Sequence, residues 1–205
     1  MVINWYGEGS FKIQSGSVAI MTDPFESSVG LTAPRFKSDL VLKTEVDKVY
    51  VSEKTSEARN IGGPGEYEVK GVMVQGFPAA HKIMGDAAVY RVKVEDMSLG
   101  ILGPLSSAEL TPDAVEALRN LEILFVPVGG APAMEPAEAA KLVKKLEPRI
   151  VVPCFFKIPG LKRNAEGVES FSKALGLKAE PAEEKLTIKL KDITWQGTKL
   201  IILRV

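Results

Sequence analysis

Short hydrophobic runs, several of them alternating with polar residues, fill the first hundred positions and predict β-strands. In Ala88–Val94 the side chains alternate cleanly, which is the period of a half-buried strand. Gly, Ser, Pro and Asp separate the runs and favour turns between them. The other strands predicted in this half are Val2–Tyr6, Phe11–Gln14, Val18–Met21, Leu40–Leu42, Lys48–Val51, Glu66–Lys70, Val72–Phe77 and Leu99–Leu102.

The second half changes to a helical period. Thr111 starts a first helix, because a capping hydroxyl is followed by Pro at the first helical position and then by an acid. Further helices are predicted at Glu135–Leu146 and Ala165–Leu175, the latter ending before a glycine. Strands are predicted at Ile123–Val128, Ile150–Val152, Leu186–Leu190 and Leu200–Leu203. This order predicts one α/β domain over residues 1–205, with sheets covered by helices.

Charge and hydropathy exclude several classes of function. The chain has 26 basic and 26 acidic residues, so its net charge is zero. That balance argues against nucleic acid or an anionic membrane as a partner. No apolar run approaches the roughly 20 residues that cross a bilayer. The N-terminus lacks the basic start and apolar core of a signal peptide, so we expect a cytoplasmic protein.

The chain has one histidine and one cysteine, which excludes a structural zinc site built from several such residues. His81 is expected to be a surface or structural histidine rather than an acid or base. Cys154 has apolar neighbours that raise a thiol's pKa, so a core thiol is favoured over a nucleophile paired with His81. The basic run Lys157–Arg163 is interpreted as a solvated surface rather than a phosphate contact.

Several runs together resemble the metallo-β-lactamase superfamily, in its small metal-dependent hydrolase branch. They are Ile3–Phe11, Thr22–Phe25, Gly63–Val72, Leu124–Gly130 and Pro148–Pro153, in the order that the family has them. The resemblance covers nearly the whole chain. It implies a four-layer αββα sandwich, with two β-sheets face to face, helices outside and a metal site at one sheet edge.

The resemblance also places this chain's residues on the family's metal-binding positions. Those positions carry Glu8, Glu45, Asp47, Val49, Tyr50, Ile101, Pro104 and Phe155. Zinc is bound by imidazole, thiolate or carboxylate groups, and several of these side chains have no such group. We therefore expect a non-catalytic protein with no cofactor and no family zinc. It would bind or assemble with a protein or small molecule, and self-association is common among relatives of this fold.

Two alternatives remain. In the first, carboxylates form an altered metal site for Mg²⁺ or Mn²⁺, which prefer oxygen ligands, and the protein is a metal-dependent hydrolase. Its ligands would come from Glu8, Asp23, Glu45 and Asp47, which otherwise lie solvated at the rim or pair with lysines. In the second, a pocket lined by Val49, Tyr50, Ile101 and Phe155 binds a small molecule.

Overall fold

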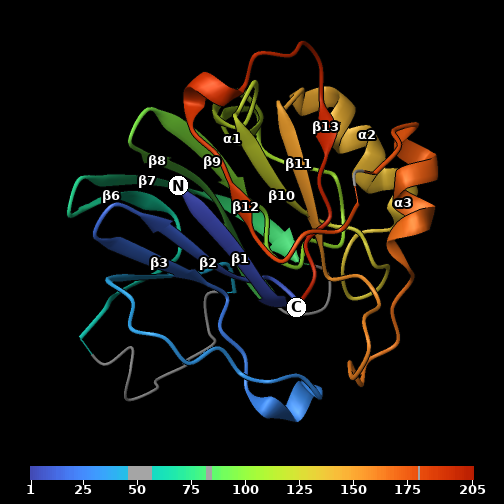
Figure 1. Cartoon of the computed structure of the whole chain (residues 1–205), viewed down its shortest axis with the longest axis horizontal. Coiled ribbons are helices and arrows are strands. Elements are labelled where there is room, and N and C mark those ends of the chain that lie inside the picture. The colour runs from blue at the N-terminus through green and yellow to red at the C-terminus, as the bar shows by residue number, and fades with distance from the viewer. Residues whose placement is uncertain (46–56, 82–84, 180) are drawn as a thin grey trace.

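Two β-sheets pack against each other in the computed structural model, which describes residues 1–45, 57–81, 85–179 and 181–205 (Figure 1). The first sheet has the order β12-β1-β2-β3-β4-β5 and the second β13-β11-β10-β9-β8-β7-β6. The strands of the first sheet are β1 (Val2–Gly7), β2 (Ser10–Ser15), β3 (Val18–Thr22), β4 (Leu40–Lys43), β5 (Arg59–Gly62) and β12 (Leu186–Thr187). Those of the second are β6 (Gly65–Val69), β7 (Val72–His81), β8 (Gly85–Val94), β9 (Met97–Ile101), β10 (Ile123–Pro127), β11 (Ile150–Cys154) and β13 (Lys199–Leu200).

Both sheets mix antiparallel and parallel pairs. β1, β2 and β3 form an antiparallel meander, whereas β3, β4 and β5 are parallel. In the second sheet β6 to β9 are antiparallel, and β9, β10, β11 and β13 are parallel. Parallel neighbours end at the same edge, so the segments that follow β3 and β4, and those that follow β9 and β11, start from a common edge of their sheet.

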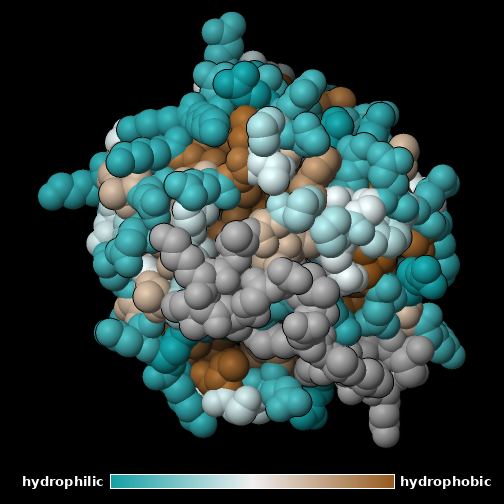
Figure 2. All heavy atoms as spheres, turned by 180° about the vertical axis from the view of Figure 1, so that it is seen from behind, coloured by the Kyte–Doolittle hydropathy of each residue, from teal (hydrophilic) through white to brown (hydrophobic). Residues whose placement is uncertain are grey.

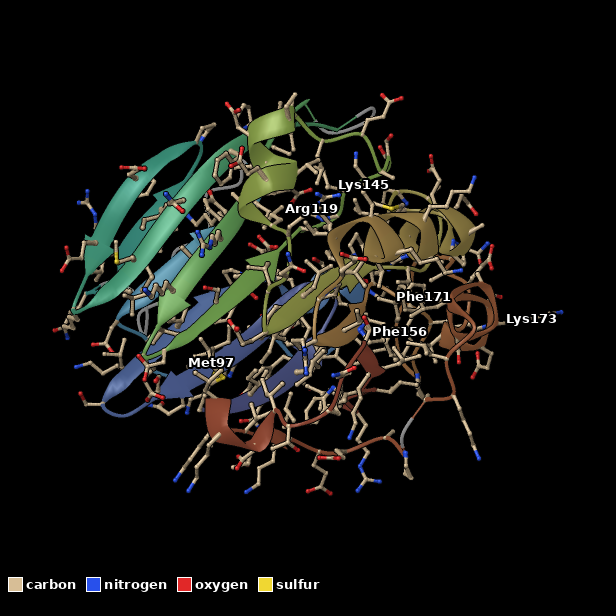
Figure 3. All side chains as sticks on the ribbon, turned by 90° about the horizontal axis from the view of Figure 1, so that it is seen from above. Met97, Arg119, Lys145, Phe156, Phe171 and Lys173 are labelled. Atoms are coloured by element: carbon tan, nitrogen blue, oxygen red, sulfur yellow. The ribbon has the colours of Figure 1, made fainter. Side chains whose placement is uncertain are left out.

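Among the described residues, the helices belong to the second half of the chain, apart from the short 3-10 turn η1 (Ser27–Val29). They are α1 (Pro112–Ala117), α2 (Pro136–Leu146), α3 (Val168–Leu175) and the 3-10 turn η3 (Leu190–Asp192). The predicted cap is confirmed, because the Thr111 hydroxyl accepts a hydrogen bond from the Ala114 N–H at 3.3 Å. Figure 3 shows α1 on the far side of the second sheet from β1 and β2. The predicted sandwich of two β-sheets packed face to face is confirmed.

Aromatic rings join the two sheets in the interior. The Phe11 ring on β2 lies 4.4 Å from the Phe125 ring on β10, measured between centroids. The Trp5 ring lies 4.8 Å from that of Phe156, which Figure 3 labels in the interior beside Phe171. Burying each such side chain contributes about 1.5–3 kcal/mol to the free energy of folding. This core fixes the ends of β1, β2 and β11 relative to one another.

The structure differs from the sequence prediction in a few elements. β7 and β8 are longer than predicted, and β5 was missed because only Ile61 of its residues is buried. Pro153 lies inside β11 and does not end it. β13 pairs only with Ile150 and Val151, so the sheet needs no hydrogen bond from a backbone N–H at position 153. The predicted strand Lys48–Val51 lies outside the described residues.

Large hydrophobic side chains are mostly buried in the described part of the chain. Among the described residues the large hydrophobic side chains that are exposed are Met73, Leu190 and Val205. Figure 2 shows one face, on which hydrophobic residues appear in scattered groups among hydrophilic ones. None of the helices in the described ranges combines the length and apolar character that a membrane crossing needs.

Candidate functional site

A cavity of about 370 Å³ lies at the edge where the strand ends meet, within the usual size range of small-ligand pockets. The β1–β2 turn, the segments after β3 and β4, and the loops after β9 and β11 all contribute to it. Its lining residues are Glu8, Gly9, Asp23, Pro24, Phe25, Ser28, Val29, Lys43, Glu45, Pro104, Pro132, Phe155, Lys162 and Arg163. The fold therefore brings residues from both sheets to one concave site.

Glu8 in the β1–β2 turn forms an ion pair with Arg163. The Arg163 Nε donates to both carboxylate oxygens, at 2.9 and 3.1 Å. The side chains are only 22% and 11% exposed, for Arg163 and Glu8 respectively, so the pair is largely withdrawn from water. This contradicts the interpretation of Lys157–Arg163 as a solvated surface, at least for Arg163, because residues 155 positions apart meet here.

Arg163 also fixes the segment that follows β11. Its Nη2 donates to the Phe155 carbonyl and its Nη1 to the Asn164 carbonyl. The guanidinium carbon lies 5.9 Å from the centre of the Phe155 ring. A Cβ on Gly9 would lie 2.8 Å from that ring, so only glycine allows the ring to approach the turn. One arginine thus ties together two corners of the pocket.

Asp23 is held by Thr44 across the parallel β3–β4 pair. The Thr44 N–H donates to Asp23 Oδ1, and the Thr44 hydroxyl donates to Oδ2, both at 2.7 Å. A Cβ on Gly103, whose φ is +60°, would lie 2.0 Å from the Thr44 Oγ1. The glycine after β9 therefore makes room for the hydroxyl that orients Asp23.

Three lining residues that are not glycine have left-handed backbones. Glu8, Asp23 and Phe155 have φ values of 49°, 34° and 59°. Such conformations are costly for residues with a Cβ and are found mainly where the surrounding structure enforces them. All three line one cavity, which indicates that contacts within the pocket, and not only local turns, hold the backbone in this conformation.

Glu45 and Lys43 come from the end of β4. Glu45 pairs with Ala87 in an isolated β-bridge, and Lys43 contributes its carbonyl oxygen, which accepts a hydrogen bond from the Tyr90 hydroxyl at 2.7 Å. The Tyr90 hydroxyl also accepts from the Gly63 N–H at 2.7 Å. Burial raises the pKa of Tyr90 above its ordinary value, so it stays neutral and acts as a structural link. Sequence reasoning missed this role, since Tyr90 looked like any inward residue of an alternating strand.

The two residues first considered for nucleophilic chemistry do not form a described pair. Cys154 is buried, and burial raises the pKa of its thiol, with the Asp23 and Glu8 charges adding to the effect. The thiol is therefore protonated and unreactive at neutral pH. His81 is the last residue of β7, and its side chain lies outside what the structure describes.

The predicted metal-site positions are only partly gathered. Glu8, Glu45, Pro104 and Phe155 line the pocket together with Asp23. Ile101 is buried at the end of β9 and is not among the lining residues. The positions Asp47, Val49 and Tyr50 lie outside the described residues.

A metal ion does not find a complete set of ligands in the described ranges. No three His, Cys, Asp or Glu side chains there lie close enough together to hold one. Glu8 is committed to Arg163, and each Asp23 oxygen accepts a hydrogen bond from Thr44. The described residues alone therefore do not fit a metal, and no catalytic step is assigned to one.

Comparisons with known proteins define the class. A model of the β-lactamase superfamily domain matches residues 2–155. The chain belongs to the metallo-β-lactamase superfamily.

Similar proteins add names and organisms. The chain is 28% identical to a UPF0173 metal-dependent hydrolase of Pyrococcus horikoshii, over 89% of this chain and 97% of that protein. It is 27% identical to a protein of the same name from Thermococcus kodakarensis, with the same coverage. A solved structure from Thermotoga maritima, described as a candidate Zn-dependent hydrolase of this superfamily, has a TM-score of 0.79 at 25% identity, covering 99% of both chains.

These relatives contradict two of the expectations from sequence. A non-catalytic protein and the absence of a cofactor were expected, whereas both curated relatives are named metal-dependent hydrolases. The expectation treated the loss of imidazoles as the loss of a metal. The relatives' names favour the alternative considered from sequence, a metal-dependent hydrolase whose cation is bound by carboxylate oxygens.

Proposed function

We propose that this protein is a metal-dependent hydrolase with a carboxylate-rich site in the pocket. The observation that carries the proposal is the convergence of Glu8, Asp23 and Glu45 on one cavity, at an edge where strands of both sheets end. The names of the relatives support the reaction class and the dependence on metal. The described residues do not complete a ligand set. The set therefore stays the predicted one of Glu8, Asp23, Glu45 and Asp47, and Mg²⁺ or Mn²⁺ suits its oxygen chemistry.

The chain's own residues prepare this pocket for a reaction with water. Arg163 compensates the charge of Glu8, and Thr44 fixes the orientation of Asp23. Pro104 and Phe155 add apolar surface beside these groups. Charged groups held in fixed geometry beside apolar surface interact more strongly than they do in bulk water.

The test is a hydrolysis assay with a panel of an ester, a phosphodiester and a lactone. Each is measured with Mn²⁺, with Zn²⁺ and with a chelator, using wild type, Glu45→Gln and Asp23→Asn. Glu57→Gln is the matched control, because Glu57 pairs with Lys37 on the exposed surface. We expect turnover that needs metal and falls about tenfold or more in both pocket variants. Turnover no higher than the buffer blank, or unchanged in both variants, would contradict the proposal.

A further inference from the structure

The pocket has an apolar wall large enough for the body of a small molecule. Pro24, Phe25, Val29, Pro132 and Phe155 contribute to it, from segments that follow β3, β10 and β11. Ligand pockets typically combine such walls with a few placed polar groups. The polar groups of the same pocket then indicate the charge of the polar group that a ligand carries.

Two of the acids in the pocket are already matched by protein donors. Glu8 accepts two hydrogen bonds from Arg163, and Asp23 accepts two from Thr44. Arg163 is matched as well, since its remaining nitrogens donate to carbonyl oxygens. An organic cation on a ligand would therefore compete with Arg163 and Thr44 for these two carboxylates.

The lysines of the pocket differ from these groups. In the part of the chain that the structure describes, neither the Lys43 nor the Lys162 ammonium has a hydrogen-bond or ion-pair partner. The backbone of Lys162 is fixed beside the pocket, because its main-chain N–H donates to the Val29 carbonyl at 3.0 Å, and the residue is exposed. Its Cγ lies 2.8 Å from where a Cβ on Gly30 would be, so the stem packs on that glycine.

We propose that the pocket binds a small organic anion with a compact apolar body, and that Lys162 pairs with its carboxylate or phosphate group. The proposal rests on the proposed function in using the same pocket, and it names the substrate class. Lys162 is thereby a specificity-determining residue, with Lys43 as the second cation of the site.

Probes of one shape and different charge test the proposal. Phenylacetate, phenyl phosphate, phenylacetamide and phenethylamine carry one phenyl body with anionic, neutral or cationic ends. Binding to the full-length protein is measured by isothermal titration calorimetry, so that no turnover is needed. We expect one or both anions to bind and the amide and amine to bind at least about tenfold more weakly. The two anions distinguish a carboxylate from a phosphate ligand.

Variants assign the effect to Lys162. Lys162→Gln is expected to weaken anion binding about tenfold, and Lys162→Arg to retain most of it. Lys185→Gln is the control, since Lys185 is exposed and does not line the pocket. Thermal melts of each variant establish that it is folded.

The outcomes separate this proposal from the proposed function. Equal binding of the anionic, neutral and cationic probes, no binding of either anion, or full affinity in Lys162→Gln overturns the anion site. Anion binding without hydrolysis of any panel substrate overturns the hydrolase and leaves the anion site standing.

Discussion

The two ends of the sandwich use left-handed backbone for different purposes. At one end Lys70 and Glu95, with φ of 51° and 54°, lie in the short turns of the β6–β7 and β8–β9 hairpins. Tight hairpins of two residues need positive φ, so the turn itself explains the conformation. These side chains belong to the solvent-facing edge, and we call it the hairpin end.

At the other end, the pocket end, the same conformation occurs in Glu8, Asp23 and Phe155, which line one cavity. Glu8 lies in a turn as well, but its carboxylate is bound by an arginine from a distant loop. At the hairpin end, the strained backbone conformation allows the chain to reverse direction between two strands. At the pocket end it holds polar groups in a shared site.

Glycine substitutions should separate the two ends most strongly. Gly71 and Gly103 both have positive φ, at 79° and 60°, so alanine carries a backbone cost of about 1–2 kcal/mol at each. A Cβ at position 71 meets nothing within 4 Å, whereas at 103 it meets the Thr44 Oγ1 at 2.0 Å. We expect Gly103→Ala to lower the free energy of unfolding by about 4 kcal/mol, because overpacking adds to the strain. Urea denaturation measures both, and equal losses would remove the distinction.

Charge removal is the next test. Arg163→Gln leaves the Glu8 carboxylate withdrawn from water without its cation. We expect a loss of about 2–3 kcal/mol, somewhat below the roughly 3–5 kcal/mol of a fully buried pair, because some exposure remains. The double variant Glu8→Gln/Arg163→Gln should recover part of that loss, since no unpaired charge remains.

The matched substitution at the hairpin end is Lys70→Gln. Lys70 bonds Asp39 at 2.5 Å, but its side chain is 63% exposed. Exposed pairs contribute about 0–1 kcal/mol, so the expected loss is about 0.5 kcal/mol. Both variants are measured in the same urea series. Equal losses of unfolding free energy in Arg163→Gln and Lys70→Gln would contradict the expectation that the buried pair contributes more than the exposed one.

The smallest expected effect is a pH dependence at the hairpin end. The Lys70 ammonium, followed by the Ala19 N–H, lowers the pKa of Asp39 below its ordinary value. A lowered folded-state pKa stabilises the protein above the unfolded value of about 3.9, and that contribution is lost as the pH falls through the folded value. The difference in unfolding free energy between wild type and Asp39→Asn should therefore shrink between pH 7 and about pH 3. Chemical denaturation at both pH values measures it, and a constant difference would argue against the linkage.

Much of the fold follows from local sequence patterns, and much of the site does not. Alternation in Ala88–Val94 and the Thr111 cap predict elements that the structure contains. The strand β5 was not predicted, because its only buried side chain is Ile61 and the segment has no hydrophobic periodicity. Pairing of Glu8 with Arg163 joins residues far apart in the chain, so no local pattern encodes it.

The family motifs led to Glu8, Asp23, Glu45, Pro104 and Phe155, all of which line the pocket. They did not lead to Thr44 or Lys162, because these residues act through tertiary contacts that a motif does not record. The conclusion drawn from the replaced histidines is contradicted by the relatives, which are named metal-dependent hydrolases. Residue type at motif positions excludes one set of ligands and does not exclude a cation bound by oxygen.

The most direct test of the metal-dependent hydrolase is the amount of metal that the pure protein retains. The protein is prepared without a histidine tag, incubated with Mn²⁺ and with Zn²⁺ in turn, desalted and analysed by mass spectrometry for bound metal. The account predicts about one equivalent of at least one metal in wild type, and much less in Glu45→Gln, because a carboxylate-rich site depends on its acids. Near-zero occupancy by both metals in wild type would contradict it.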